Sequence, residues 1–172
     1  MLWTDGNKIM EQWKIISEIY KQIATRTGAI VYPDVKITVN INDICQCMID
    51  KSGQRIIVDE KQYEQPAVYE MSVEILFEGN NIDMLLQAYG EAAVLFKDNP
   101  EIDIVKYNWH GSSTDKIYLE PVIRHVDHGN VNYCEGVYRY SLIYKTEFSL
   151  NSQKAYGFKR VEKRDIYGVV KK

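Results

Sequence analysis

The order of patterns between residues 69 and 96 constrains the fold more than any other feature of this chain. Apolar side chains alternate with mostly polar ones from Tyr69 to Phe77, the two-residue period of a strand that is buried on one face. A Gly-Asn-Asn sequence at 79–81 then interrupts the pattern. The helical period that follows predicts a buried helix face made of Ile82, Leu85, Leu86, Tyr89, Ala92, Ala93 and Phe96. The sequence therefore predicts a strand and a helix that share one core.

The N-terminal segment predicts a second amphipathic helix, from about Asn7 to Thr25. Asp5 and Asn7 both suit the N-cap position. Gly28 ends the pattern and suits the left-handed position after a helix. The expected buried stripe consists of Ile9, Trp13, Ile16, Tyr20 and Ile23.

Strand patterns fill the interval between the two helices. We expect a short strand over residues 29–32 and a strand with one solvated face over residues 35–42. Residues 44–49 and 54–58 flank an Asp-Lys-Ser-Gly sequence, which predicts a hairpin. Residues 59–65 are polar and charged, and we expect them to form a connector.

The second half of the chain closes with further strands. Residues 107–113 predict a loop, and residues 117–123 predict a strand that Pro121 keeps at a sheet edge or a bulge. Residues 125–136 predict a second loop or a hairpin tip. The last strand pattern, at residues 138–150, is longer than the usual ~5–6 residues and offers an edge to a neighbouring copy. Its expected apolar face consists of Tyr138, Tyr140, Leu142, Tyr144, Thr146, Phe148 and Leu150.

Length and charge divide the chain into a body and a tail. The 172 residues fit one domain. Residues 1–150 carry 14 Lys and Arg against 22 Asp and Glu, whereas residues 151–172 carry 7 against 2. We therefore expect a single α+β domain over 1–150, an antiparallel, twisted β-sheet flanked by two main α-helices, with an extended basic C-terminal arm over 151–172. The 13 tyrosines suit half-buried sheet surfaces and protein interfaces.

The excess of acidic residues and the sequence of residues 1–6 limit the partners and the cellular location that we expect for this chain. An acidic body argues against specific nucleic-acid binding, which needs a basic face. Residues 1–6 lack the basic start and apolar core of a signal peptide, and no apolar run approaches the ~20 residues that span a bilayer. Few cysteines in a chain of this size are typical of a reducing compartment. We expect a chain that is made in a cytoplasm and has no membrane partner.

One set of residues resembles a metal site. His125 and His128 are three residues apart, Cys134 follows them, and Cys45 and Cys47 lie far upstream. Two His and a Cys are ligands that zinc accepts, but their spacing matches no closed zinc site well. We therefore favour a turn with exposed histidines and expect no metal.

Nucleophilic and acid–base catalysis are also disfavoured. Cys134, His125 and Asp127 lie on one predicted loop tip, where water is not excluded, and the sequence around His110 has the same weakness. The carboxylates of Glu70 and neighbouring residues on the same strand face are expected to be solvated or ion-paired. Phosphate-binding loops, dinucleotide fingerprints and zinc-protease motifs are absent from the sequence. The sequence thus favours a protein that is not an enzyme and uses no cofactor.

One order of elements runs through residues 7–150: a helix, a strand and hairpin, an extended strand, an amphipathic helix and closing antiparallel strands. The residues that carry this order are Gln65–Phe77, Asn80–Asp83, Leu95-Phe96 and Asn99-Pro100. The order resembles the tail terminator, or tail-completion, proteins of tailed phages and of phage-tail-like contractile particles.

The resemblance implies a structural viral protein. Such proteins form a homo-hexameric ring on the last ring of the tail tube and stop tube polymerisation. In contractile injection systems they also contact the top of the sheath, and in phages they present a surface to the neck or collar. The resemblance implies no cofactor, and it implies a location at the head-proximal end of the tail in a virion or phage-tail-like particle, after assembly in the bacterial host cytoplasm.

Partner-binding residues are expected on the last strand and in the arm. Extended arms that add a strand to a neighbour lock rings together, and a basic arm suits an acidic neighbour, including another copy of this chain. The expected partner-binding residues are Tyr140, Tyr144, Tyr156, Phe158, Lys159, Arg160, Lys163, Arg164 and Tyr167.

Other interpretations stay open. Within the same kind of particle, the chain could be a head–tail joining or neck protein, or a tail-tube protein, although a tube protein needs paired hairpins and this sequence contains more helix. An unrelated protein-binding adaptor with a tyrosine-rich face would be a monomer that forms no ring. An enzyme built around His110, His125, Asp127 and Cys134 is the third alternative, and no substrate for it can be named.

Overall fold

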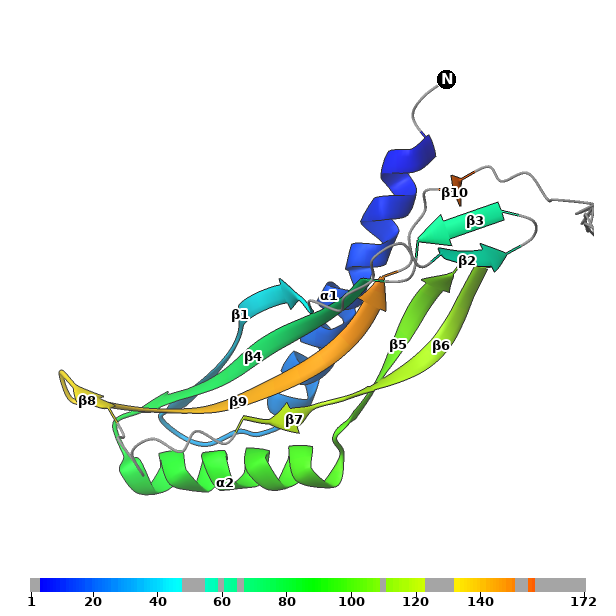
Figure 1. Cartoon of the computed structure of the whole chain (residues 1–172). Helices are drawn as coiled ribbons and strands as arrows, with labels where there is room; N and C mark the ends of the chain where they lie inside the picture. The colour runs from blue at the N-terminus through cyan, green and yellow to red at the C-terminus, as the bar shows by residue number, and fades with distance from the viewer. Residues whose placement is uncertain are drawn as a thin grey trace, which may run out of the picture.

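The chain adopts an α+β fold, as the sequence predicted (Figure 1). The computed structural model describes residues 4–47, 55–58, 61–64, 67–108, 111–122, 132–150 and 155–156. These residues form α1 (Thr4–Thr27), β1 (Val35–Gln46), β2 (Arg55–Val58), β3 (Lys61–Glu64), β4 (Ala67–Gly79), α2 (Ile82–Asp98), β5 (Glu101–Asn108), β6 (Gly111–Tyr118), β7 (Glu120–Pro121), β8 (Asn132–Cys134), β9 (Val137–Leu150) and β10 (Ala155–Tyr156).

A long antiparallel sheet forms the body, in the strand order β1-β4-β9-β7, with β8 also paired to β9. The β4–β9 register runs without interruption from Ala67 opposite Leu150 to Gly79 opposite Tyr138. β1 pairs with β4 through a β-bulge between Ile41 and Asp43. The sheet is visibly twisted in Figure 1, so the predicted antiparallel, twisted sheet is confirmed.

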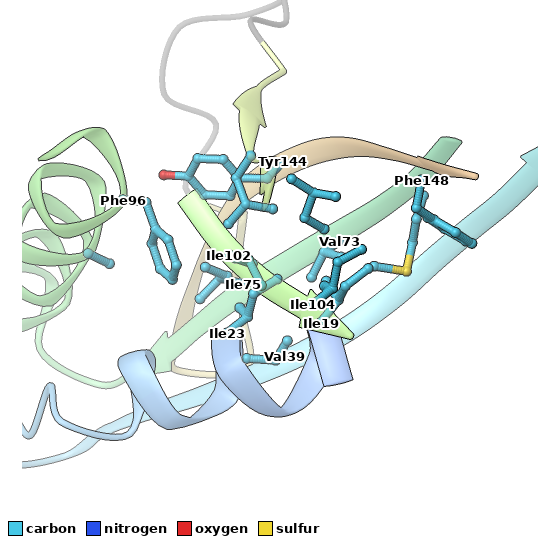
Figure 2. Close-up of a cluster of buried hydrophobic side chains, with 14 of the residues drawn as sticks. Ile19, Ile23, Val39, Val73, Ile75, Phe96, Ile102, Ile104, Tyr144 and Phe148 are labelled. Carbon is cyan, nitrogen blue, oxygen red and sulfur yellow. The ribbon is translucent and has the colours of Figure 1, made fainter. Parts of the chain in front are cut away.

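One face of this sheet carries the core (Figure 2). Alternate β4 side chains are fully buried, because successive residues of a strand point to opposite faces. Both helices and β5 contribute to the same cluster, and each large apolar side chain that is fully buried contributes roughly 1.5–3 kcal/mol. The fully buried β4 residues are Met71, Val73, Ile75 and Phe77.

α2 begins where the sequence indicated. Asn81 is its N-cap, and the side-chain oxygen of Asn81 accepts hydrogen bonds from the backbone nitrogens of Asp83 at 3.0 Å and Met84 at 3.3 Å. The predicted buried face is partly wrong, since Leu86 is 44% exposed. Leu86 follows the buried Leu85 by a rotation of ~100°, which turns it towards solvent. The buried α2 residues are Leu85, Ala88, Ala92 and Phe96.

α1 is longer than predicted, and its buried stripe is different. Ile15, Ile19 and Ile23 are buried at four-residue spacing, whereas Tyr20 is 39% exposed. Of the predicted stripe, Ile23 is buried, Ile16 is partly buried against the core and Tyr20 is wrong, whereas the side chains of Ile9 and Trp13 are not described. Gly28 does not adopt a left-handed conformation as we predicted. A Cβ atom at Gly28 would lie 3.1 Å from the carbonyl oxygen of Ala24, so a close backbone approach favours glycine there.

The strands before β4 also differ from prediction. Residues 29–32 form no strand, and residues 44–46 continue β1 and pair with residues 69–71 of β4. β2 pairs instead with β3, which lies inside the predicted connector. The predicted hairpin of residues 44–49 with 54–58 is therefore wrong, because long antiparallel pairing with β4 keeps the end of β1 on the main sheet. Its predicted turn lies outside the described residues.

A further hairpin replaces the predicted loop at residues 107–113. β5 pairs with β6 from Glu101 opposite Tyr118 to Asn108 opposite Gly111. The loop prediction failed because residues 112–116 of β6 are polar and exposed on both sides of the strand, so they show no two-residue period. Pro121 lies in the short strand β7, which pairs with β9, in agreement with the predicted edge position. β8, the turn at 135–136 and β9 form the predicted hairpin tip, and residues 123–131 lie outside the described part.

Candidate protein-interaction surfaces

Most of the residues considered for metal binding and catalysis lie outside the part of the chain that the structure describes. No group of three or more His, Cys, Asp or Glu side chains there could hold a metal ion. His110, His125, Asp127 and His128 lie outside the described residues. The backbone of Cys134 belongs to β8, but its side chain is not described.

Of the two upstream cysteines, Cys45 lies near the end of β1 and Cys47 follows directly after it. The thiol of Cys45 is exposed and free, and Cys47 is half-buried and free. Burial raises the pKa of the Cys47 thiol, and the nearby Glu147 carboxylate raises it further. A raised pKa keeps the thiol protonated, whereas nucleophilic and metal-binding cysteines act as thiolates.

The main sheet has a second face, opposite the core, whose side chains are exposed or half-buried. Charged pairs cross its strands. The Lys145 amine donates to the Glu70 carboxylate at 2.6 Å, and the Arg139 guanidinium donates to the Glu78 carboxylate at 2.7 Å. This hydrogen bond with Glu70 raises the pKa of Lys145. The face is therefore a solvated, ion-paired surface, as we expected for Glu70.

The tyrosines of β9 point towards the core. The Tyr140 ring meets the Tyr89 ring edge-on with centroids 4.5 Å apart. Tyr144 is 5% exposed, and its ring lies 5.2 Å from that of Phe96 (Figure 2). The structure thus places the predicted partner-binding residue Tyr144 in the core, where α2 covers it, and leaves Tyr140 half-buried. Strand alternation explains this placement, because even-numbered β9 residues share the buried face.

The beginning of the arm joins a small separate sheet. Tyr156 lies in β10, which pairs antiparallel with β3 and continues the order β10-β3-β2. The arm therefore adds a strand within its own chain at this point. The other arm residues predicted to bind partners, Phe158, Lys159, Arg160, Lys163, Arg164 and Tyr167, lie outside the described residues.

One edge of the main sheet is open along most of its length. β1 has 12 residues and, within the described part of the chain, pairs with β4 alone. An open edge presents unpaired backbone N–H and C=O groups to another strand. Ile41, 38% exposed at the bulge of this strand, adds an apolar side chain to it.

A groove of 430 Å³ lies near the opposite edge of the sheet, between β9 and β6. Residues 146–149 of β9 form one wall, and residues 115–118 of β6 form the other. β7 joins the two walls at one end, and Figure 1 shows β9 and β6 diverging from it. The sequence did not predict this groove, because it depends on the β5–β6 hairpin, whose residues 107–113 were predicted to form a loop.

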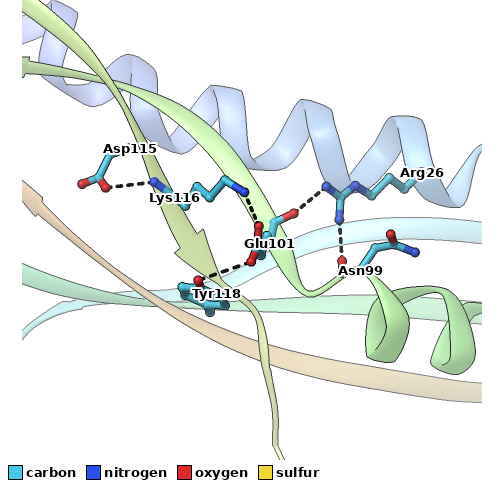
Figure 3. Close-up of polar contacts among 6 residues, drawn as sticks. All are labelled: Arg26, Asn99, Glu101, Asp115, Lys116 and Tyr118. Atoms are coloured by element: carbon cyan, nitrogen blue, oxygen red, sulfur yellow. Dashed lines mark hydrogen bonds and ion pairs between the residues drawn. The ribbon is translucent and has the colours of Figure 1, made fainter.

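A polar cluster fixes the β6 wall against β5 and α1 (Figure 3). The Glu101 carboxylate accepts from the Lys116 amine and, at 3.3 Å, from the Tyr118 hydroxyl. The pKa of Glu101 is lowered, chiefly by the hydrogen bond from Lys116. The Arg26 guanidinium donates to the backbone oxygens of Asn99 at 2.7 Å and Glu101 at 2.6 Å. The cluster therefore links both strands of the hairpin to α1.

Comparison with known proteins does not assign the chain to a family, because no protein-family model and no curated protein matches it. Among the described residues, no helix is long and apolar enough to cross a membrane.

Proposed function

We propose that this chain is a structural protein that caps a phage-type tail tube. A homo-hexameric ring of it ends polymerisation of the tube, and of the sheath where one exists, and joins the tail to the neck or collar. The proposal rests on the resemblance of residues 7–150 to tail terminator proteins. The observation that supports it best is the open edge of β1, which is 12 residues long.

An open strand edge suits assembly into a ring. Native proteins usually protect long edge strands, because such strands pair readily with other chains. A closed ring of identical subunits needs two different surfaces that bind each other head to tail. The β1 edge and the groove between β6 and β9 lie at opposite sides of the main sheet, so each of them can take part in the contact with a different neighbour.

The proposed role is structural and uses no cofactor. The tail tube protein, the sheath and the neck or collar proteins are the expected partners, besides further copies of this chain. A head–tail joining or neck protein remains the alternative within the same particle, because it would use the same kind of ring. The proposed location is the head-proximal end of the tail, in a virion or phage-tail-like particle.

The location can be tested on particles from the native host. A peptide tag at the N-terminus is labelled with gold-conjugated antibody, and intact particles are imaged by negative-stain electron microscopy. We expect one focus of label at the head-proximal end of each tail. Label along the whole tail would favour a tail-tube protein, and particles without label would contradict the proposal and favour an unrelated adaptor.

A further inference from the structure

The groove between β6 and β9 has the form of a strand-binding site. Its β9 wall, residues 146–149, pairs with β4 on one side only within the described part of the chain. Its β6 wall, residues 115–118, pairs there with β5 on one side only. Each wall therefore turns an unpaired strand edge towards the groove, and a strand inserted between them could pair on both of its edges.

A buried polar atom at this groove lacks a partner. Thr146 lines the groove and is 2% exposed, and its hydroxyl oxygen has no hydrogen-bond partner among the described residues. A buried polar group without a partner is costly, so such groups in native proteins usually find one. An additional backbone segment in the groove would bring N–H and C=O groups that could form a hydrogen bond with the Thr146 hydroxyl.

The charges of the groove favour a basic segment. Lys106, Lys116 and Lys145 are each in an ion pair, with Asp115, Glu101 and Glu70 respectively. Two further carboxylates line the groove, and neither forms an ion pair with a described residue. These two are Glu120 and Glu147.

The C-terminal residues of this chain have the basic charge and the strand-forming side chains that suit this groove. Residues 157–172 include six Lys and Arg against two acidic residues. They contain Ile166-Tyr167-Gly168-Val169-Val170, in which β-branched and aromatic residues favour a strand. Basic residues flank this sequence on both sides, at Lys163, Arg164, Lys171 and Lys172.

We propose that residues 166–170 of one copy insert as a strand between β6 and β9 of the neighbouring copy. The inference rests on the proposed ring, because exchanged arms couple each subunit to the next. β10 holds the start of the arm on β3, and the nine residues between Tyr156 and Ile166 can reach on the order of 30 Å when extended. A free segment fits better than β1, because β1 is already paired along one edge.

Photo-crosslinking of the full-length chain tests the insertion. Tyr167 is replaced by p-benzoylphenylalanine, and the variant is mixed with unmodified chain labelled uniformly with ¹⁵N before irradiation. We expect crosslinked peptides in which an unlabelled arm is joined to a labelled segment containing residues 115–118 or 146–149. The proposal would be overturned if the crosslinks joined only unlabelled peptides to each other, or if none of them reached residues 115–118 or 146–149.

A charge-reversal pair adds a matched control. Glu120→Lys with Glu147→Lys should lower the yield of these crosslinks about tenfold, because both substitutions repel the basic arm. The amine introduced by Glu147→Lys would lie opposite Glu70 across the strands, so the fold should tolerate it. Asp98→Lys with Glu135→Lys makes the same charge change at exposed positions outside the groove, and we expect it to leave the yield unchanged. Equal yields from the two pairs would contradict the charge argument.

The outcomes separate the insertion from the ring itself. If electron micrographs show rings but no crosslink reaches the groove, insertion of the arm is ruled out and the proposed function is not contradicted. Crosslinks to the groove from a chain that labels no tail would support exchanged arms and contradict the tail-terminator role.

Discussion

Two side chains of β9 help to form the core although each of them carries a polar hydroxyl group. Tyr144 and Thr146 both point into the core from one strand, and each carries a hydroxyl into an apolar setting. Burial raises the pKa of Tyr144 to about 12, and the Thr146 hydroxyl lacks a described partner. Two measurements on single residues follow from these environments.

Thr146→Val should raise the free energy of unfolding by about 1 kcal/mol, because it removes a buried hydroxyl without a partner and keeps the shape of the side chain. Urea unfolding followed by circular dichroism measures the change. Thr146→Ser is the control, since it keeps the hydroxyl and loses a buried methyl group, and it should destabilise the chain. These expectations apply to the monomer, in which no neighbouring arm fills the groove. Destabilisation of the monomer by Thr146→Val would show that the hydroxyl has a partner within its own chain.

Tyr144 should make stability fall at high pH. Its folded pKa of about 12 exceeds the usual value of 10.0, so the folded state holds the proton more tightly than the unfolded state. The stabilisation is complete below pH 10 and is lost as the pH rises towards 12, by about 2 kcal/mol. Tyr144→Phe has no proton to lose, so its urea midpoint should fall less over this range. An identical pH dependence in both proteins would contradict the buried position of Tyr144.

Elements with a clear period were predicted well, and those defined by distant pairing were not. The alternation in β4 and β9 and the Gly-Asn-Asn break before α2 are local features, so the sequence predicted them. The pairing of β2 with β3 and of β5 with β6 was not predicted, because β3 and most of β6 are polar and show no strand period from which a register could be read. The groove between β6 and β9 was missed for the same reason, whereas the open edge of a long strand was anticipated, but for β9 rather than β1.

The start of α2 depends on one side chain. Asn81→Ala should lower the free energy of unfolding by about 1 kcal/mol, because the backbone nitrogens of Asp83 and Met84 lose their acceptor. Asn81→Asp keeps an oxygen acceptor and should stay close to the unmodified chain. Chemical denaturation of the three proteins measures the difference, and equal stabilities would contradict the capping role.

We expect the β1 edge to be needed for contact between copies of the chain but to contribute little to the stability of the fold. Ile41→Lys places a charge on the open edge, which opposes strand addition, while Ile41 is already 38% exposed. We expect fewer rings in micrographs of the purified chain and a change in unfolding free energy within about 0.5 kcal/mol. Val94→Lys makes the same type of change on the exposed face of α2, at a residue 56% exposed, and should leave rings intact. Rings unaffected by Ile41→Lys would exclude β1 from the subunit contact.

At the scale of the whole molecule, the described structure is a covered sheet with binding capacity at both of its sides. α1, α2 and the β5–β6 hairpin bury one face, while the other face, the β1 edge and the groove between β6 and β9 stay accessible. An arrangement of this kind suits a subunit that is completed by its neighbours. The proposed ring and its proposed place on a tail both depend on contacts between chains, so the decisive test is made on whole particles.

The most direct test is the tail length of particles from a host that lacks the gene for this chain. Tail lengths are measured by negative-stain electron microscopy, with the gene restored in parallel as the control. We predict abnormally long or ragged tails, because nothing would end tube polymerisation, and normal lengths after restoration. Tails of normal length without the gene would contradict the account, and if such tails also lacked heads they would identify a head–tail joining protein instead.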